Sequence, residues 1–260
     1  MKIAIFGSGV SGLFAYWACE QRGFEDKEIT FYSNKIEKPF ALGFQYLHEK
    51  CGLDLKNYLL REEILQKTFP LKISSLMYSL KVYGNINTYN SVSKLLTRTI
   101  ATSNNIYNLN DAIEILWNKY KDKIIVSNQI KDIRNLIEVR NDFDIIFSTI
   151  PLNLLFPAEY FEYSTSYVMS CPIDNPTNCV YYDVSLGSSV FRLGVLFNNF
   201  FVESTEKLRY GDFVPIKKVV TFTGDMKLPE NINLIGRYGA WDKAILAHNV
   251  YKIVRSKFNE

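Results

Sequence analysis

The segment with the clearest capacity for chemistry is the glycine turn at residues 7–12, GSGVSG. Its spacing, G-x-G-x-x-G, is typical of turns that bind a dinucleotide pyrophosphate. Gly7 permits a tight exit from a strand, Gly9 lets the backbone approach the phosphates, and Gly12 lets a helix pack against that strand. Backbone N–H groups and the positive end of the helix dipole would face the phosphates. The turn predicts a dinucleotide site, with a purely structural turn as the alternative. The predicted contacts here are Gly7, Gly9, Val10, Ser11 and Gly12.

The elements that must position this turn are predicted on both sides of it. Residues 2–6 (KIAIF) form a short apolar run, typical of a strand that is buried on both faces of a parallel sheet. From residue 10 to residue 22 apolar side chains recur at helical spacing, and Gly23 ends the helix. Residues 28–33 (EITFYS) predict a second strand. Together these segments make one β-α-β unit.

The end of the second predicted strand departs from the usual pattern. An acidic residue that bonds the ribose hydroxyls is expected about 20 residues after the turn. This chain has Ser33, Asn34 and Lys35 there, and Glu37 follows. Ser33 or Asn34 could bond a ribose, Glu37 is close enough to substitute, and Lys35 would suit the 2′-phosphate of NADP. The motif alone does not separate NAD(P) from FAD.

The rest of the chain alternates between strand and helix patterns. The spacing predicts helices at residues 57–66, 110–120 and 243–257. It predicts strands at residues 76–83, 123–126, 143–149, 178–183, 190–197, 199–203, 218–223 and 233–235, with a hairpin turn at residues 198–199. The order therefore begins with β-α-β, passes through a β-rich middle and returns to strand, turn and helix.

Three further segments resemble flavoproteins. Residues 144–151 (DIIFSTIP) resemble the D-x-V-I-x-T-x-P strand of flavin amine oxidases, protoporphyrinogen oxidases and UDP-galactopyranose mutases. Residues 236–241 (GRYGAW) resemble the late G-R-x-G-x-W segment of the mutases, which passes the flavin. Residues 43–48 (GFQYLH) lie where that superfamily places a loop beside the isoalloxazine ring, and they also look like a loop of small FAD proteins from bacteriophages.

The resemblance implies FAD as the cofactor. It implies an α/β fold with a Rossmann-type FAD-binding domain, similar to glutathione reductase, and an inserted β-rich substrate domain. We expect the FAD-binding domain to comprise residues 1–75, 111–156 and 229–260, and the substrate domain residues 76–110 and 157–228. The further cofactor contacts expected are Ser33, Asn34, Lys35, Gly43, Phe44, Gln45, Val126, Thr149, Pro151, Gly236, Arg237, Gly239, Ala240 and Trp241.

Candidate catalytic residues are His48, Arg192 and His248. The chain has only two histidines, and both fall in segments expected near the flavin. An imidazole there could accept a substrate proton or bond a ring carbonyl, although His248 could equally be a residue of a helix face. Arg192 and Glu203 lie on adjacent predicted strands, where they could reach a substrate pocket or form a cross-strand ion pair. Tyr83 and Lys81 could line the same pocket.

Composition excludes several classes of function. The net charge of +3 argues against a broad nucleic-acid footprint. The four cysteines include no C-x-x-C pair, which argues against a zinc ribbon and a disulfide redox centre, so no metal is expected. No apolar run reaches about 18 residues and no signal-peptide pattern is evident, so we expect a cytoplasmic protein without a membrane span.

Three functions stay open at this stage. The first is an FAD-dependent oxidoreductase, similar to amine oxidases, that moves a hydride from a C–N or C–O bond to flavin N5. The second is a non-redox mutase similar to UDP-galactopyranose mutase, and the third is a dinucleotide-binding protein without catalysis. The partner would be a small molecule or a nucleotide, and a modified DNA base is a variant that the net charge does not support. The oligomeric state is open.

Overall fold

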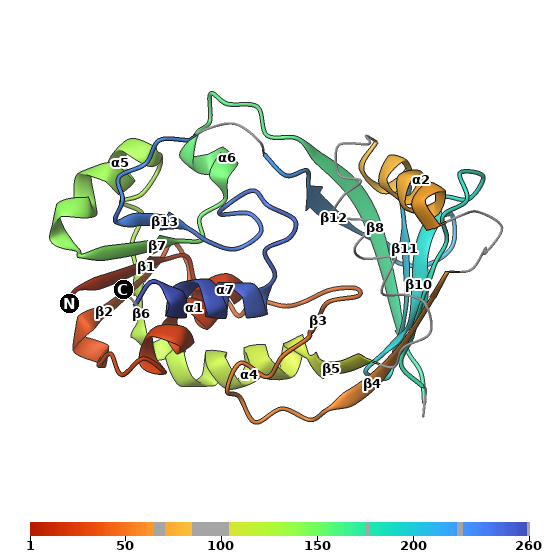
Figure 1. Cartoon of the computed structure of the whole chain (residues 1–260), viewed down its shortest axis with the longest axis horizontal. Helices are drawn as coiled ribbons and strands as arrows, with labels where there is room; N and C mark the ends of the chain where they lie inside the picture. The colour runs from red at the N-terminus through yellow and green to blue at the C-terminus, as the bar shows by residue number, and fades with distance from the viewer. Residues whose placement is uncertain (65–70, 85–103, 175–176, 223–225, 259–260) are drawn as a thin grey trace.

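The computed structural model describes residues 1–64, 71–84, 104–174, 177–222 and 226–258 (Figure 1). Within these residues the strands form two sheets, which stand toward opposite ends of the long axis. The first sheet is parallel and has the order β13-β7-β1-β2-β6. Its strands are β1 (Ile3–Phe6), β2 (Ile29–Ser33), β6 (Ile124–Val126), β7 (Ile145–Ser148) and β13 (Ile232–Leu234).

Helices cover both faces of the parallel sheet. Ile3 and Ile5 point toward the face covered by α1 (Val10–Glu20), α4 (Leu109–Tyr120) and α7 (Ala247–Ser256). Ala4 and Phe6 point toward the face covered by α5 (Ile133–Glu138) and α6 (Leu152–Leu155). Alternate residues of β1 therefore enter two different cores, which is why the strand is apolar throughout. The strand order is that of a Rossmann-type sheet, and the predicted α/β class is confirmed.

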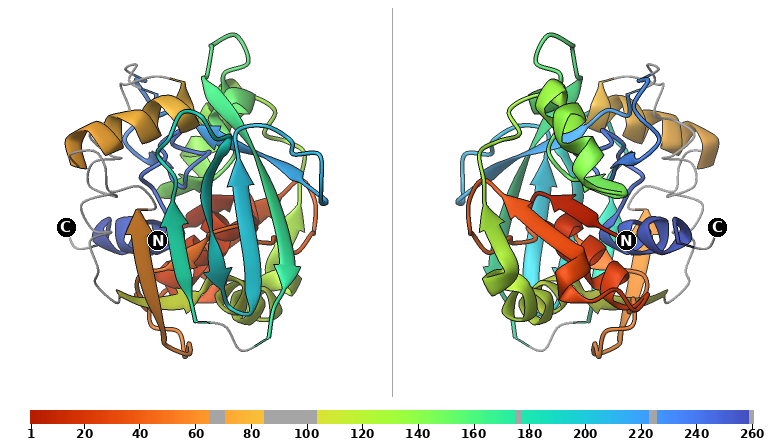
Figure 2. Two further views of the ribbon diagram at one scale, coloured as in Figure 1. Left: turned by 90° about the vertical axis from the view of Figure 1, so that its right-hand side faces the viewer. Right: turned by 90° about the vertical axis from the view of Figure 1, so that its left-hand side faces the viewer.

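The second sheet is curled and has the order β12-β8-β11-β10-β9-β4-β5-β3 (Figure 2, left). Its neighbouring strands pair antiparallel, except that β4 and β9 are parallel. The strands are β3 (Tyr46–Leu47), β4 (Tyr58–Ile64), β5 (Asn104–Asn108), β8 (Tyr163–Pro172), β9 (Cys179–Tyr182), β10 (Val190–Leu196), β11 (Asn199–Ser204) and β12 (Val214–Val219). Helix α2 (Leu71–Tyr83) packs against β8 and β10. The predicted domain boundaries stay a prediction.

The prediction of a helix at residues 57–66 is wrong as far as residue 64, because residues 58–64 form β4; residues 65–66 lie outside the described residues. Burial in β4 alternates: Leu60 and Glu62 are buried, whereas Leu59 is exposed. Glu62 favours a helix by propensity, but here it accepts hydrogen bonds from the hydroxyls of Tyr46 and Tyr182. Tertiary contacts therefore override the local preference.

The prediction of a strand at residues 76–83 is also wrong, because these residues form the second half of α2. Ser74, Tyr78 and Val82 are buried at a spacing of four residues, which places them on one face of a helix. Two boundaries also shift. The strand predicted at residues 218–223 is β12 (Val214–Val219), and the closing helix begins at Ala247 rather than at residue 243.

The hairpin predicted between residues 190–197 and 199–203 is confirmed as β10 and β11. Its turn consists of Phe197 and Asn198, one residue earlier than predicted, because Leu196 pairs with Asn199. Both turn residues have positive φ, 49° and 63°. That geometry matches the right-handed twist of the two strands. No helix in the described ranges combines the length and apolar character that a membrane crossing requires.

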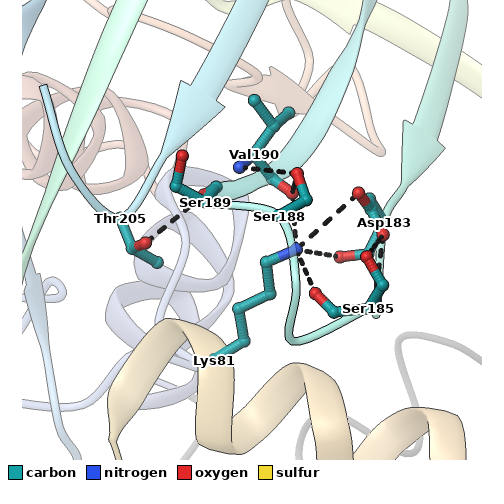
Figure 3. A network of polar contacts seen from close by, with 7 residues as sticks. All are labelled: Lys81, Asp183, Ser185, Ser188, Ser189, Val190 and Thr205. Atoms are coloured by element: carbon teal, nitrogen blue, oxygen red, sulfur yellow. Dashed lines mark hydrogen bonds and ion pairs between the residues drawn. The ribbon is translucent and has the colours of Figure 1, made fainter. Parts of the chain in front are cut away.

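Lys81 anchors α2 to the loop between β9 and β10 (Figure 3). Its side chain is only 4% exposed, and its Nζ donates to the backbone carbonyls of Asp183, Ser185 and Val190 at 2.5–3.1 Å. Burial lowers the pKa of Lys81, while the nearby carboxylate of Asp183 opposes that shift. This anchor fixes α2 against the curled sheet, and with it Tyr78, which lies on the same helix.

Replacing Lys81 with methionine is expected to destabilise the fold by about 2–4 kcal/mol, since three buried carbonyls lose their donor. Urea unfolding monitored by circular dichroism measures the change. Lys27→Met is the matched control, because Lys27 is exposed and its ion pair with Glu25 lies at the surface. Equal unfolding free energies for the two variants would show that the anchor contributes nothing.

Candidate functional site

A cavity of about 1720 Å³ runs between the N-terminus of α1 and the curled sheet. It exceeds the roughly 300–1,000 Å³ of pockets for a single drug-sized ligand, so it has room for a large cofactor and a substrate. Its walls come from the carboxyl ends of β1, β2 and β7 and from strands β10, β11 and β12. The carboxyl edge of an open parallel sheet is where such folds bind ligands.

The glycine turn forms one end of this cavity. Gly7 has a φ of +99°, and a Cβ there would lie 2.3 Å from Thr149 Oγ1. A Cβ on Gly12 would lie 1.8 Å from the carbonyl oxygen of Gly7. A Cβ on Gly9 would meet nothing within 4 Å, because this residue faces the cavity. Helix α1 has no side-chain cap and no acidic residue in its first turn, so its backbone donors face a site suited to an anion.

The end of β2 provides polar groups beside the turn. Ser8 Oγ donates to Ser33 Oγ at 2.8 Å, and both side chains are buried. Asn34, Lys35 and Glu37 line the cavity, where Lys35 and Glu37 form an exposed ion pair. This pairing offsets the charge of Lys35, which weakens the case for a 2′-phosphate ligand.

Thr149, the residue directly after β7, packs against the glycine turn. Its Oγ1 lies 3.0 Å from the carbonyl oxygen of Phe6 and 3.1 Å from that of Gly7, and it can donate to either. The segment after β13 adds a third backbone wall, because a Cβ on Gly236 would lie 2.3 Å from Ser11 Oγ. Sequence segments more than 80 residues apart therefore meet at the N-terminus of α1.

A buried charge cluster lies on the wall formed by the curled sheet. Glu203 is 1% exposed and accepts from Arg192 at 2.7 and 2.8 Å and from Lys218 at 2.8 Å. Burial alone raises the pKa of Glu203, but the two cations outweigh it and lower the pKa to about 2. Glu203 also accepts the backbone N–H of Phe44, so it ties the loop at residues 43–48 to this sheet. The expected cross-strand ion pair of Arg192 and Glu203 is present.

The two histidines lie side by side. Their ring centroids are 5.3 Å apart with an interplanar angle of 83°, and His48 also packs against the ring of Tyr46. His48 lines the cavity. His248 is 6% exposed, does not line the cavity and lies behind the His48 ring. Burial, reinforced by His48, lowers the pKa of His248 to about 4. His248 is therefore neutral at neutral pH, and its buried Nδ1 has no hydrogen-bond partner within the described part of the chain.

The structure brings most of the predicted site residues to this cavity. Those that line it are Gly7, Gly9, Val10, Ser11, Ser33, Asn34, Lys35, Phe44, Gln45, His48, Thr149, Pro151, Arg192, Arg237 and Gly239. Those that do not line it are Gly12, Gly43, Val126, Gly236, Ala240, Trp241 and His248. Trp241 is buried and donates its indole N–H to the carbonyl of Glu162, which is a packing position. The cofactor and catalytic roles stay predictions.

Sequence reasoning missed several residues of the cavity wall. Of the two residues considered for the pocket, Tyr83, for which a core position was favoured, lines the cavity, whereas Lys81 points away into the loop network described above. Lys218 and Lys243 also line the cavity, as do Tyr78 and Tyr182. In β12, Lys217 is exposed and Lys218 is largely buried, a difference that two adjacent lysines do not reveal in the sequence. No group of three or more potential metal ligands occurs among the residues described.

No protein-family model and no curated protein matches this chain, whereas many solved structures do. The chain is similar over 98% of its length to 94% of a reduced UDP-galactopyranose mutase, at 10% identity and a TM-score of 0.58. It is similar over its whole length to 82% of an HpxO variant from Klebsiella pneumoniae complexed with FAD, at 10% identity and a TM-score of 0.54. A geranylgeranyl bacteriochlorophyll reductase-like protein from Thermoplasma acidophilum matches at 8% identity and a TM-score of 0.51, covering 98% of this chain and 76% of that one. The predicted fold is confirmed: this is the Rossmann-type fold of FAD-binding flavoproteins with a β-rich insertion.

The buried position of His248 predicts acid sensitivity. Its pKa is about 4 in the folded chain and near 6.5 when unfolded, so the unfolded chain binds the proton more readily. Stability should therefore be complete above pH 6.5 and fall as the pH drops toward 4. Between pH 7 and pH 4.5 the unmodified chain should lose about 1–2 kcal/mol more stability than His248→Gln. Urea titrations at several pH values test this, and parallel pH profiles for the two proteins would contradict it.

Proposed function

We propose that this chain is an FAD-dependent oxidoreductase. The observation that carries the proposal is one continuous cavity that joins the glycine turn at α1 to the charged and aromatic wall of the curled sheet. A dinucleotide held at the turn would extend toward that wall, where a substrate could meet its reactive end. The solved structures with the same fold include a protein complexed with FAD and a reductase-like protein, and both support the proposal.

The residues at the turn fit a dinucleotide. Gly9 leaves the space that a pyrophosphate needs, and the first turn of α1 carries no side chain that would repel it. Ser33 and Asn34 offer oxygen and amide groups for a ribose in place of the usual carboxylate. Arg237 and Gly239 line the same cavity from the segment that resembles the flavin-side loop of the mutases.

Bound FAD would supply the acceptor for a hydride taken from a C–N or C–O bond of the substrate. This chain would supply binding, orientation and exclusion of water. The aromatic side chains of Phe44, Tyr78 and Tyr182 form apolar walls at the curled sheet. His48, at the edge of the cavity, could accept the proton that leaves the substrate heteroatom. His248 stays neutral behind it and would position the His48 ring.

A second candidate is a non-redox flavin mutase. The observation that favours it is the match to a reduced UDP-galactopyranose mutase, which covers 98% of this chain and 94% of that one. The cationic wall of the cavity would also suit a nucleotide diphosphate. Hydrogen peroxide release during turnover in air supports the oxidoreductase, whereas turnover that requires prior reduction with dithionite supports the mutase.

Gly9→Asp tests the cofactor site. A carboxylate at this position would face the pyrophosphate, so FAD retention should fall at least about tenfold through charge repulsion. Absorbance of the purified protein and of the cofactor released by heat measures the content. Gly187→Asp is the matched control: a Cβ there also meets nothing within 4 Å, and Gly187 lies in the loop between β9 and β10, outside the cavity lining. Full FAD content in Gly9→Asp would show that the phosphate site lies elsewhere.

A further inference from the structure

Four cations line the curled-sheet end of the cavity near Tyr83: Arg192, Lys218, Arg237 and Lys243. Lys243 Nζ lies 4.3 Å from the centre of the Tyr83 ring. Burial is the largest cause of the lowered pKa of Lys218 and of Lys243, and the charge of Arg237 lowers both pKa values further. The charges of Arg192 and Arg237 oppose the rise that burial causes in the pKa of Tyr83. The four side chains come from β10, β12 and the segment after β13, yet they share one wall.

The acidic groups on this wall do not balance the cations. Glu203 compensates Arg192 and Lys218 together, and Asp242 attracts Lys243 while it also accepts from Thr221 and Ala244. Arg237 is partly buried, and its guanidinium has no hydrogen bond or ion pair with any residue that the structure describes. Among the described residues, Arg192, Lys218 and Arg237 carry three positive charges against the single carboxylate of Glu203, which leaves +2 at this end without counting Lys243.

The excess is a property of the cavity and not of the surface as a whole. Of the residues that the structure describes, eight lysines and arginines and two glutamates line it, a difference of +6, whereas the whole chain carries +3. A partly desolvated cation without a counter-ion costs free energy, and charged groups in this situation are concentrated at ligand sites. The wall would therefore repel a cationic amine and attract an anion.

We propose that this end of the cavity is an oxyanion site, formed by Lys218, Arg237 and Lys243, for a carboxylate or phosphate group of the substrate. The proposal rests on the proposed function, in which the glycine turn holds the phosphates of the cofactor and leaves this wall for the substrate. Phe44, Tyr78 and Tyr182 would pack against the uncharged part of that substrate. The substrate class is thus an anionic small molecule or nucleotide with an oxidisable C–N or C–O bond.

Calorimetric titration of the FAD-saturated protein with sodium phosphate and with sodium acetate, at constant ionic strength in chloride, tests the site. Saturating FAD blocks the glycine turn as an alternative place for phosphate. At least one probe should bind, and its identity distinguishes phosphate from carboxylate. Lys218→Gln and Arg237→Gln should each weaken that binding about tenfold or more, since each removes a charge-assisted hydrogen bond. Lys218→Arg should retain it.

Lys131→Gln is the matched control, because Lys131 also lines the cavity but lies just before α5, away from this wall. Its binding of the probe should equal that of the unmodified chain. Arg237→Gln leaves no carboxylate without a partner, so it tests the site even where Lys218→Gln folds poorly. Absence of binding by both probes, or equal binding by Lys218→Gln, Arg237→Gln and Lys131→Gln, overturns the proposal. FAD content, measured on the same samples, reports separately on the proposed function.

Discussion

The close approach of backbone to backbone around Gly7 and Gly12 is the constraint on which the rest of this molecule depends. A Cβ on Gly12 would lie 1.8 Å from the carbonyl oxygen of Gly7, so only glycine lets α1 begin this near to the end of β1. Thr149 from β7 and the backbone at Gly236 then reach the same point. Three strand ends are thereby brought together beside the free N–H groups of one helix. The cavity starts at this junction.

Glu203 has a comparable role at the other end. It is buried on β11, and it accepts from cations on β10 and β12 and from the backbone of Phe44. One carboxylate therefore holds two cations at the cavity wall and fixes the loop that precedes His48. A buried carboxylate with a single partner would be expensive, whereas three donors satisfy it. The cavity is lined by segments of both sheets, and Glu203 organises the part that the curled sheet provides.

Much of the cofactor side could be predicted from the sequence because its signals are local. The β-α-β unit and the strand β7 follow from runs of adjacent residues, whereas the place of the segment after β13 was implied by its resemblance to the mutases. Residues 58–64 and 76–83 were assigned the wrong element type. The side-chain partners of Glu62 are Tyr46, Asn104 and Tyr182, which lie far from it along the chain, and the helical spacing of Ser74, Tyr78 and Val82 spans the start of the predicted strand. The convergence of Lys218, Arg237 and Lys243 depends on tertiary geometry alone. Spacing in the sequence carries no information on it.

The proposed function requires the N-terminus of α1 to hold the pyrophosphate of FAD. Mass spectrometry of the small molecule released by heat from the purified, folded protein tests it most directly, together with the visible spectrum before release. We expect a yellow protein that releases an equimolar amount of FAD relative to the protein chain. A colourless, folded protein that also fails to take up added FAD would contradict it.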